Sequence, residues 1–309
     1  MFPAISGPDS TNSVEVSVID TRENGSRNER QRRNMSRAFL TLASVLLTAS
    51  AVVQATAQSI ATDPKAAPAG RRSDSTSNGV TVVALYDSIG SSGKGVPRVT
   101  ELLQREPRVQ VTKIKAEDIQ QGALNRTDVV VFTGGSGSKQ AGALGETARA
   151  EVKAFVERGG GYLGICAGSY LACEGFSWGL HVLDAKTVSP KWKRGVGNVQ
   201  IELTDKGREI FGDRRGRLTV RYANGPILKP AGSDAIPDFE PLAFFRSELA
   251  KNDTPKGVMV NSPAIVAGHF GRGRVLCISP HPEQTEGLED FVARAVRWLA
   301  PPTPADTAK

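Results

Sequence analysis

The stretch that decides the fold is GGGYLGICAGSYLA, residues 159–172. An apolar run, YLGI, leads directly into Cys166, and three small residues follow it. This pattern predicts a buried strand that turns sharply into a helix, because such a turn needs small neighbours around the residue at its apex. The spacing Gly164-x-Cys166-x-Gly168 is typical of a nucleophile elbow. A buried structural cysteine at the end of a strand would give part of the same pattern.

Strands and helices alternate around this elbow. Apolar runs typical of buried parallel strands cover residues 81–88, 109–115, 128–135 and 162–166. Helical spacing covers residues 97–105 and 141–157, and the glycines at 159–161 end the second of these helices. Short connections between alternating strands and helices predict an α/β fold with a doubly wound, mostly parallel sheet.

The second half of the sequence changes character. Residues 181–222 hold short strands such as 199–203, broken by Gly and Arg, which predict an antiparallel extension. The runs 264–270 and 274–280 flank a glycine turn and predict a hairpin whose second strand returns to the main sheet. Residues 287–299 predict a closing helix. The sheet domain should therefore span residues 79–300, and we expect a disordered tail over 301–309.

A histidine and a glutamate follow the returning strand. His281-Pro282-Glu283 would lie at its C-terminal end, the edge at which sites collect in open parallel sheets. There His281 could act as a base toward Cys166, and Glu283 could hold the imidazole ring. A helix that begins at Cys166 would favour the thiolate. A polar surface-loop histidine is the simpler alternative.

The other two histidines carry weaker expectations. His269 lies in a strand-like run and is expected to be structural, whereas His181 lies in a region whose fold the sequence does not define.

The elbow and the downstream pair together resemble a known family. A G-x-C-x-G elbow with a distant His-x-Glu is similar to the class I glutamine amidotransferases. The sequence of residues 159–172 resembles most closely the biotin–protein ligase N-terminal domain-like branch of that superfamily. The resemblance covers residues 79–300 and implies a flavodoxin-like sheet. It also implies that Cys166 is the nucleophile, His281 the general base and acid, and Glu283 the orienting carboxylate.

The same resemblance implies an oxyanion hole at the glycine turn after the third strand. Its donors would be backbone N–H groups of Gly134, Gly135 and Ala167. Ordinary tight-turn chemistry explains these glycines equally well. Asn224, in an Asn-Gly-Pro sequence, either lines the same pocket or simply forms a turn.

The N-terminal region indicates export. Residues 38–53 form an uncharged apolar run of signal-peptide length, shorter than the about 20 residues of a transmembrane helix. A small-x-small sequence ends at Ala57, so we expect cleavage between Ala57 and Gln58 and a periplasmic or extracellular protein. An uncleaved membrane anchor is the alternative.

The start and the linker follow from this assignment. Translation from Met35 would give a compact signal peptide over residues 35–57 and would make 1–34 a misassigned start; otherwise 1–34 is a disordered leader. Residues 58–78 are rich in Ala, Pro and Ser and predict a flexible linker.

Composition excludes several functions. The net charge is +7, but a cluster of arginines in the first 37 residues accounts for much of it, and aromatics make up only 6%. A nucleic-acid surface is therefore not expected. Three cysteines and three histidines are too few and too scattered for a zinc site, and the glycines at 90–95 lack a dinucleotide fingerprint. We expect no metal and no cofactor. The odd number of cysteines leaves at least one free thiol.

Two functions remain. One is an exported hydrolase that attacks a small-molecule or peptide amide through a Cys166 thioester. The other is a catalytically silent binding domain that keeps the elbow for its shape. Neither a synthetase nor a biotin-ligase catalytic domain follows the sheet in this sequence, so we expect neither parent activity to transfer unchanged. An activated Cys166 should alkylate faster than an ordinary thiol.

Overall fold

The structure is a computed structural model that describes residues 79–301. The leader, the signal peptide with its cleavage site, the linker and nearly all of the C-terminal tail lie outside the described residues, so those expectations stay predictions. Within residues 79–301, no helix combines the length and apolar character that a membrane crossing requires.

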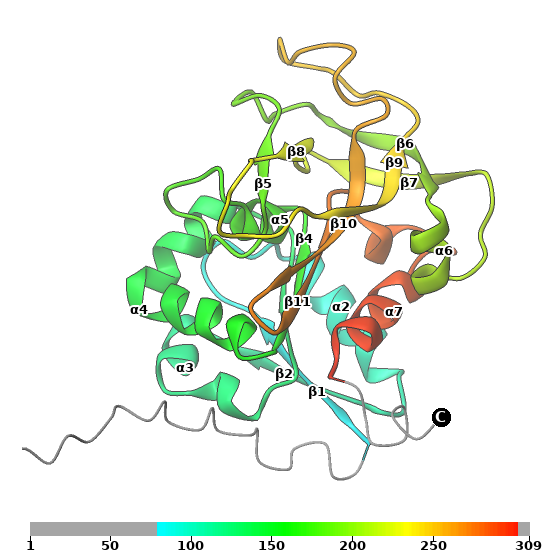
Figure 1. Cartoon of the computed structure of the whole chain (residues 1–309). Coiled ribbons are helices and arrows are strands. Elements are labelled where there is room, and N and C mark those ends of the chain that lie inside the picture. The colour runs from blue at the N-terminus through cyan, green and yellow to red at the C-terminus, as the bar shows by residue number, and fades with distance from the viewer. Residues whose placement is uncertain (1–78, 302–309) are drawn as a thin grey trace, which may run out of the picture. The chain divides into compact units, whose positions relative to one another are not determined.

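A nine-stranded sheet forms the centre of the domain, in the order β2-β1-β3-β4-β11-β10-β9-β6-β7 (Figure 1). Neighbours from β2 to β11 are parallel, and the remaining pairs are antiparallel. The strands are β1 Thr81–Tyr86, β2 Val109–Ile114, β3 Val129–Phe132, β4 Gly161–Ile165, β6 Val196–Leu203, β7 Arg217–Ala223, β9 Glu240–Phe245, β10 Pro263–Phe270 and β11 Gly273–Ile278. This order confirms the predicted parallel core with an antiparallel extension.

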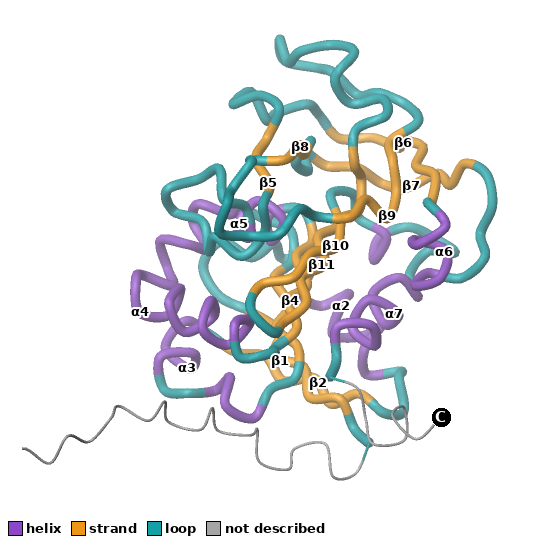
Figure 2. The backbone as a smooth tube through the Cα atoms, viewed as in Figure 1, coloured by secondary structure: helices purple, strands orange, loops and turns teal. Residues whose placement is uncertain are grey.

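Helices cover both faces of the parallel core (Figure 2). The helices α2 Gly95–Gln104 and α7 Asp290–Leu299 pack on one face, and α3 Ala116–Gln120 and α4 Gly137–Glu157 lie on the other. β3 and β4 are fully buried, as their unbroken apolar sequences predict. Two separate apolar clusters, one on each face, therefore hold the sheet between the helices.

The boundaries of the three predicted helices differ by a few residues. α2 covers Gly95–Gln104 instead of residues 97–105. α4 begins at Gly137 instead of Ala141, since the Ser136 side chain caps it by accepting a hydrogen bond from Lys139 N. α4 ends as predicted at the glycine run, where Gly159 has φ 104°. α7 begins at Asp290 instead of residue 287.

The predicted hairpin is present: β10 and β11 pair in antiparallel fashion, and β11 returns beside β4. Smaller elements complete the fold. They are the helices α5 Ala167–Ala172 and α6 Asp205–Phe211, the 3-10 turns η1 Ala123–Arg126 and η2 Pro282–Gln284, and the separate two-stranded sheet of β5 Ala185–Thr187 and β8 Leu228–Pro230.

Candidate active site

Cys166 stands at the turn between β4 and α5. Its backbone has φ 52° and ψ −99°, a conformation that residues other than glycine rarely adopt. The end of β11 supports this turn, because Cys166 N donates to Ile278 O at 2.8 Å. The Ser169 hydroxyl adds a hydrogen bond of 3.0 Å to the same carbonyl. The strained residue is thus anchored on the central strand of the sheet.

The two glycines that flank Cys166 are required by packing. A Cβ at Gly164 would stand 2.6 Å from the Gly168 backbone, and a Cβ at Gly168 would stand 2.2 Å from Phe132 O. Both distances are shorter than real Cβ contacts allow. The G-x-C-x-G spacing is therefore a consequence of how closely the strand, the turn and the helix approach each other.

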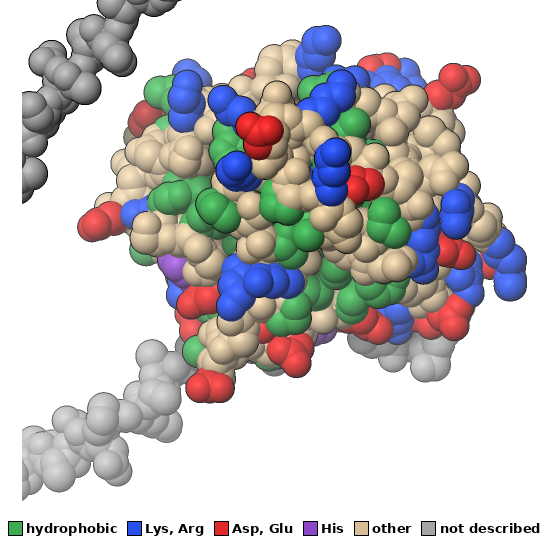
Figure 3. Space-filling view, turned by 90° about the horizontal axis from the view of Figure 1, so that it is seen from above, with side chains coloured by type: hydrophobic (Ala, Val, Ile, Leu, Met, Phe, Trp, Pro, Cys, Tyr) green, Lys and Arg blue, Asp and Glu red, His purple; other side chains and the backbone are tan. Residues whose placement is uncertain are grey.

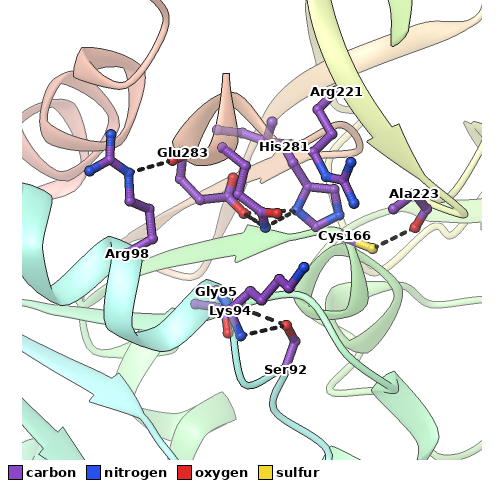
Figure 4. Close-up of polar contacts among 12 residues, drawn as sticks. Ser92, Lys94, Gly95, Arg98, Cys166, Arg221, Ala223, His281 and Glu283 are labelled. Atoms are coloured by element: carbon purple, nitrogen blue, oxygen red, sulfur yellow. Dashed lines mark hydrogen bonds and ion pairs between the residues drawn. The ribbon is translucent and has the colours of Figure 1, made fainter. Parts of the chain in front are cut away.

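His281 and Glu283 lie together beside Cys166 (Figure 4). The His281 Nδ1 to Glu283 Oε1 distance is 2.7 Å, and both side chains are buried, with 6% and 0% of their surface exposed. Gln284 Nε2 also donates to Glu283 Oε1, at 2.9 Å. The Cys166 thiol donates to Ala223 O at 3.4 Å and also interacts with the His281 ring. The three residues named from the sequence thus meet at one place.

Their contacts set the protonation state of His281. Burial by itself lowers the pKa of the imidazole, because a poorly hydrated site disfavours the charged ring. Hydrogen bonds to Cys166 and Glu283, together with electrostatic attraction to both, outweigh burial and raise the pKa of His281 from 6.5 to about 10. These contacts therefore favour the protonated ring.

The His281 loop is held from two directions. On the side of the antiparallel extension, His281 N donates to Arg221 O at 2.7 Å, and Arg221 N donates to the Thr285 hydroxyl of the same loop at 3.0 Å. On the side of α2, Arg98 Nε donates to Glu283 O at 3.1 Å. The antiparallel extension, for which the sequence predicted no function, thus helps to position His281.

A cavity of about 330 Å³ opens in front of the thiol. Its walls come from the N-terminal end of α4, from α5 and the loop after it, and from the segment that follows β5. The lining residues are Gly135, Ser136, Gly137, Ser138, Cys166, Ala167, Tyr170, Phe176, Trp178, Thr187, Ser189, Pro190, Trp192, Ala223 and Asn224.

Two of the three residues predicted to form the oxyanion hole line the cavity. Gly135 and Ala167 line it together with Cys166. Gly134 is not among the lining residues: it packs under the His281 ring, and a Cβ there would stand 2.8 Å from His281 Cε1.

Asn224 combines the two roles that its sequence left open. It lines the cavity and also makes a turn with φ 57°. Its Oδ1 accepts a hydrogen bond of 2.7 Å from Gly195 N, so that its side chain braces the neighbouring loop.

The remaining histidines and cysteines lie elsewhere. His269 is exposed on β10, and His181 pairs with Glu174 at 2.9 Å away from the cavity. Cys173 and Cys277 are completely buried, and burial raises the pKa of both thiols, that of Cys277 to about 12. Among residues 79–301, no group of three or more His, Cys, Asp or Glu side chains is arranged to hold a metal ion.

Sequence reasoning missed the aromatic part of the cavity. Tyr170, Phe176, Trp178 and Trp192 line it, and the Phe176 and Trp178 rings stack with centroids 4.5 Å apart. Three of the four lie within 13 residues of Cys166 in a chain with only 6% aromatics, which was a usable signal. Trp192 reaches the cavity because of the course of the loop after β5, and no local sequence pattern predicts that course.

A known family model matches part of the chain. Residues 81–190 match the family model described as biotin-protein ligase, N terminal, a range that includes Cys166 and ends before His281. No curated protein matches the sequence.

Solved structures resemble the domain at low identity. PurLQS from Thermotoga maritima has a TM-score of 0.51 and 15% identity, over 71% of this chain and 96% of that one. A glutamine amidotransferase is 20% identical, with a TM-score of 0.47, over 69% of this chain and 98% of that chain. A cytoplasmic protein from Salmonella typhimurium is 16% identical, with a TM-score of 0.47, over 72% and 100%. At these identities the likeness concerns the fold.

Proposed function

Because residues 81–190 are a biotin–protein ligase N-terminal-type domain on a class I glutamine amidotransferase-like fold, we propose that the protein hydrolyses an amide through Cys166, His281 and Glu283. One observation carries the proposal. A cysteine in a strained backbone conformation faces a cavity, and the buried pair of His281 and Glu283 lies beside it. A fold that kept the elbow only for its shape would not need the buried pair.

The proposed reaction begins when His281 takes the proton of the Cys166 thiol, which leaves a thiolate beside an imidazolium. The sulfur attacks the amide carbonyl carbon, and the carbonyl electrons move to its oxygen. Backbone N–H groups of Gly135 and Ala167 stabilise the resulting oxyanion; the N–H of Ala167 opens a helix, where such donors lack partners within the helix.

The tetrahedral intermediate then collapses. The C–N bond breaks, and His281 gives its proton to the leaving amine, so that a thioester remains on Cys166. A water molecule attacks this thioester while His281 accepts its proton, and the carboxylic acid leaves as the thiolate is restored. Glu283 holds Nδ1 throughout, which keeps Nε2 directed toward the reacting atoms.

The proposal is tested with Cys166→Ala, His281→Ala and Glu283→Ala variants on a panel of glutamine, γ-glutamyl and peptide amides. Loss of the nucleophile or of its base should lower kcat by several orders of magnitude, and loss of the orienting carboxylate should lower it less. Wild-type protein that cleaves none of these amides, with a Cys166 that alkylates like an ordinary thiol, would replace this proposal with the silent binding domain.

A further inference from the structure

The lining of the cavity carries information about the substrate. None of its fifteen residues has a charged side chain. Four of them are aromatic, and the rest are small, hydroxyl-bearing or otherwise uncharged. A zwitterion bound here would give up the hydration of its ammonium and carboxylate groups without gaining charged partners from the wall, which is strongly unfavourable.

Charged side chains lie beside the cavity, outside its lining. A recess next to it is lined by Lys191 and Arg194, but its volume is about 10 Å³, too small for a carboxylate group. Arg194 is bound by Glu248 at 3.1 Å and by the carbonyls of Leu249 and Pro255. Lys191 Nζ donates to Asp253 O at 3.2 Å. These cations support the loop instead of the cavity floor.

The aromatic side chains of the cavity come from two separate segments of the chain. Tyr170, Phe176 and Trp178 make a contiguous wall, with ring centroids 6.0 and 4.5 Å apart along the series. Trp192 comes from the separate segment after β5, and 49% of its surface is exposed, an unusual state for so large an apolar side chain. The face above these loops shows hydrophobic side chains between scattered Lys and Arg (Figure 3). A planar group that entered the cavity would cover part of this apolar surface.

We propose that the site takes uncharged amides that carry a planar, apolar ring, held between the Phe176–Trp178 wall and Trp192, and that it discriminates against free glutamine. This proposal rests on the proposed function, since it names the substrate class of the same site. The size agrees: 330 Å³ corresponds to about eleven water molecules, the scale of a ligand with about ten heavy atoms.

Binding can be tested without turnover. Two of the three tryptophans of the chain, Trp178 and Trp192, line the cavity, so intrinsic fluorescence reports its occupancy. A Cys166→Ala protein is titrated with phenylacetamide, acetamide and L-glutamine. Phenylacetamide should bind with saturation and with a Kd at least tenfold below that of either other compound. Binding of L-glutamine as tight as that of phenylacetamide would overturn the proposal.

A matched pair of variants locates the ring. In the Cys166→Ala background, Trp192→Leu should raise the Kd for phenylacetamide about 3- to 10-fold, the effect of one lost aromatic contact. Trp298→Phe should leave the Kd unchanged, because Trp298 packs on Arg274 and does not line the cavity. An unchanged Kd in the Trp192 variant would also overturn the proposal.

The outcomes separate this proposal from the one on which it rests. Tight binding of phenylacetamide, with hydrolysis by the wild type neither of it nor of any amide of the panel above, supports the ring-binding cavity and refutes the hydrolase. Hydrolysis of glutamine in preference to aromatic amides supports the hydrolase and refutes the ring-binding cavity.

Discussion

The substitution Gly134→Ala should change the reactivity of Cys166 indirectly, by displacing the His281 ring. The new methyl carbon would stand 2.8 Å from His281 Cε1, well inside the 3.4–4 Å of an ordinary contact. The ring cannot simply retreat, because Glu283 holds its Nδ1 at 2.7 Å and the side chain is buried. The backbone at Gly134 does not have a positive φ, so that the methyl group and not the backbone causes the effect.

The expected magnitude follows from this geometry. A displacement of the ring by a fraction of an ångström misaligns Nε2 with the sulfur, and errors of up to 1 Å cost as much as about 100-fold in rate. We expect alkylation of Cys166 by iodoacetamide at pH 7 to slow by about 10- to 100-fold. The overpacked methyl should lower the free energy of unfolding by about 1–3 kcal/mol.

The assay reports on one thiol in the folded protein. Cys173 and Cys277 are completely buried with raised pKa values, so native-state alkylation read by mass spectrometry follows Cys166. Gly142→Ala is the matched control, since an added Cβ on this exposed part of α4 meets nothing within 4 Å. It should keep the wild-type rate and gain about 0.5–1 kcal/mol in stability. If Cys166 in a folded Gly134→Ala protein is alkylated at the wild-type rate, the added methyl group does not displace the His281 ring and the prediction is wrong.

Three further predictions concern stability and processing. The folded-state pKa of His281 lies above its unfolded value of 6.5. The contribution of His281 to the free energy of unfolding is therefore complete below pH 6.5 and is lost as pH rises through about 10. Urea unfolding across this window should show the loss in the wild type and less of it in His281→Gln. Gly168→Ala places a Cβ 2.2 Å from Phe132 O and should cost about 1–3 kcal/mol or more in the same assay, whereas an unchanged midpoint would contradict the close approach at the elbow. The mature protein should begin near Gln58 and be found outside the cytoplasm; N-terminal sequencing of exported material that finds residues 1–34 intact would exclude this processing.

The parallel core could be predicted from sequence because its signals are local. Fully buried strands such as β3 and β4 read as unbroken apolar runs, and the glycine run after α4 marks the helix end. The elbow could be predicted because small residues flank Cys166 in the sequence. The steric demand on Gly164 comes from nearby Gly168, whereas that on Gly168 comes from Phe132 on a neighbouring strand.

The rest depends on contacts between distant segments. Nothing near Gly134 in the sequence shows that it packs under His281. The aromatic cavity likewise needs Trp192 to approach the wall after α5 through a loop without regular structure. α6 was missed because seven residues carry too little periodicity to be read as a helix.

The proposed amide hydrolysis depends most directly on the reactivity of Cys166. The decisive measurement is the second-order rate constant for alkylation of native protein by iodoacetamide at pH 7, in wild type and in His281→Gln. We predict that the wild type reacts at least about tenfold faster than free cysteine, because His281 lies beside the sulfur and can act as its base, and that His281→Gln removes this advantage. A wild-type rate equal to that of free cysteine or slower, and unchanged in His281→Gln, would contradict the proposed nucleophile.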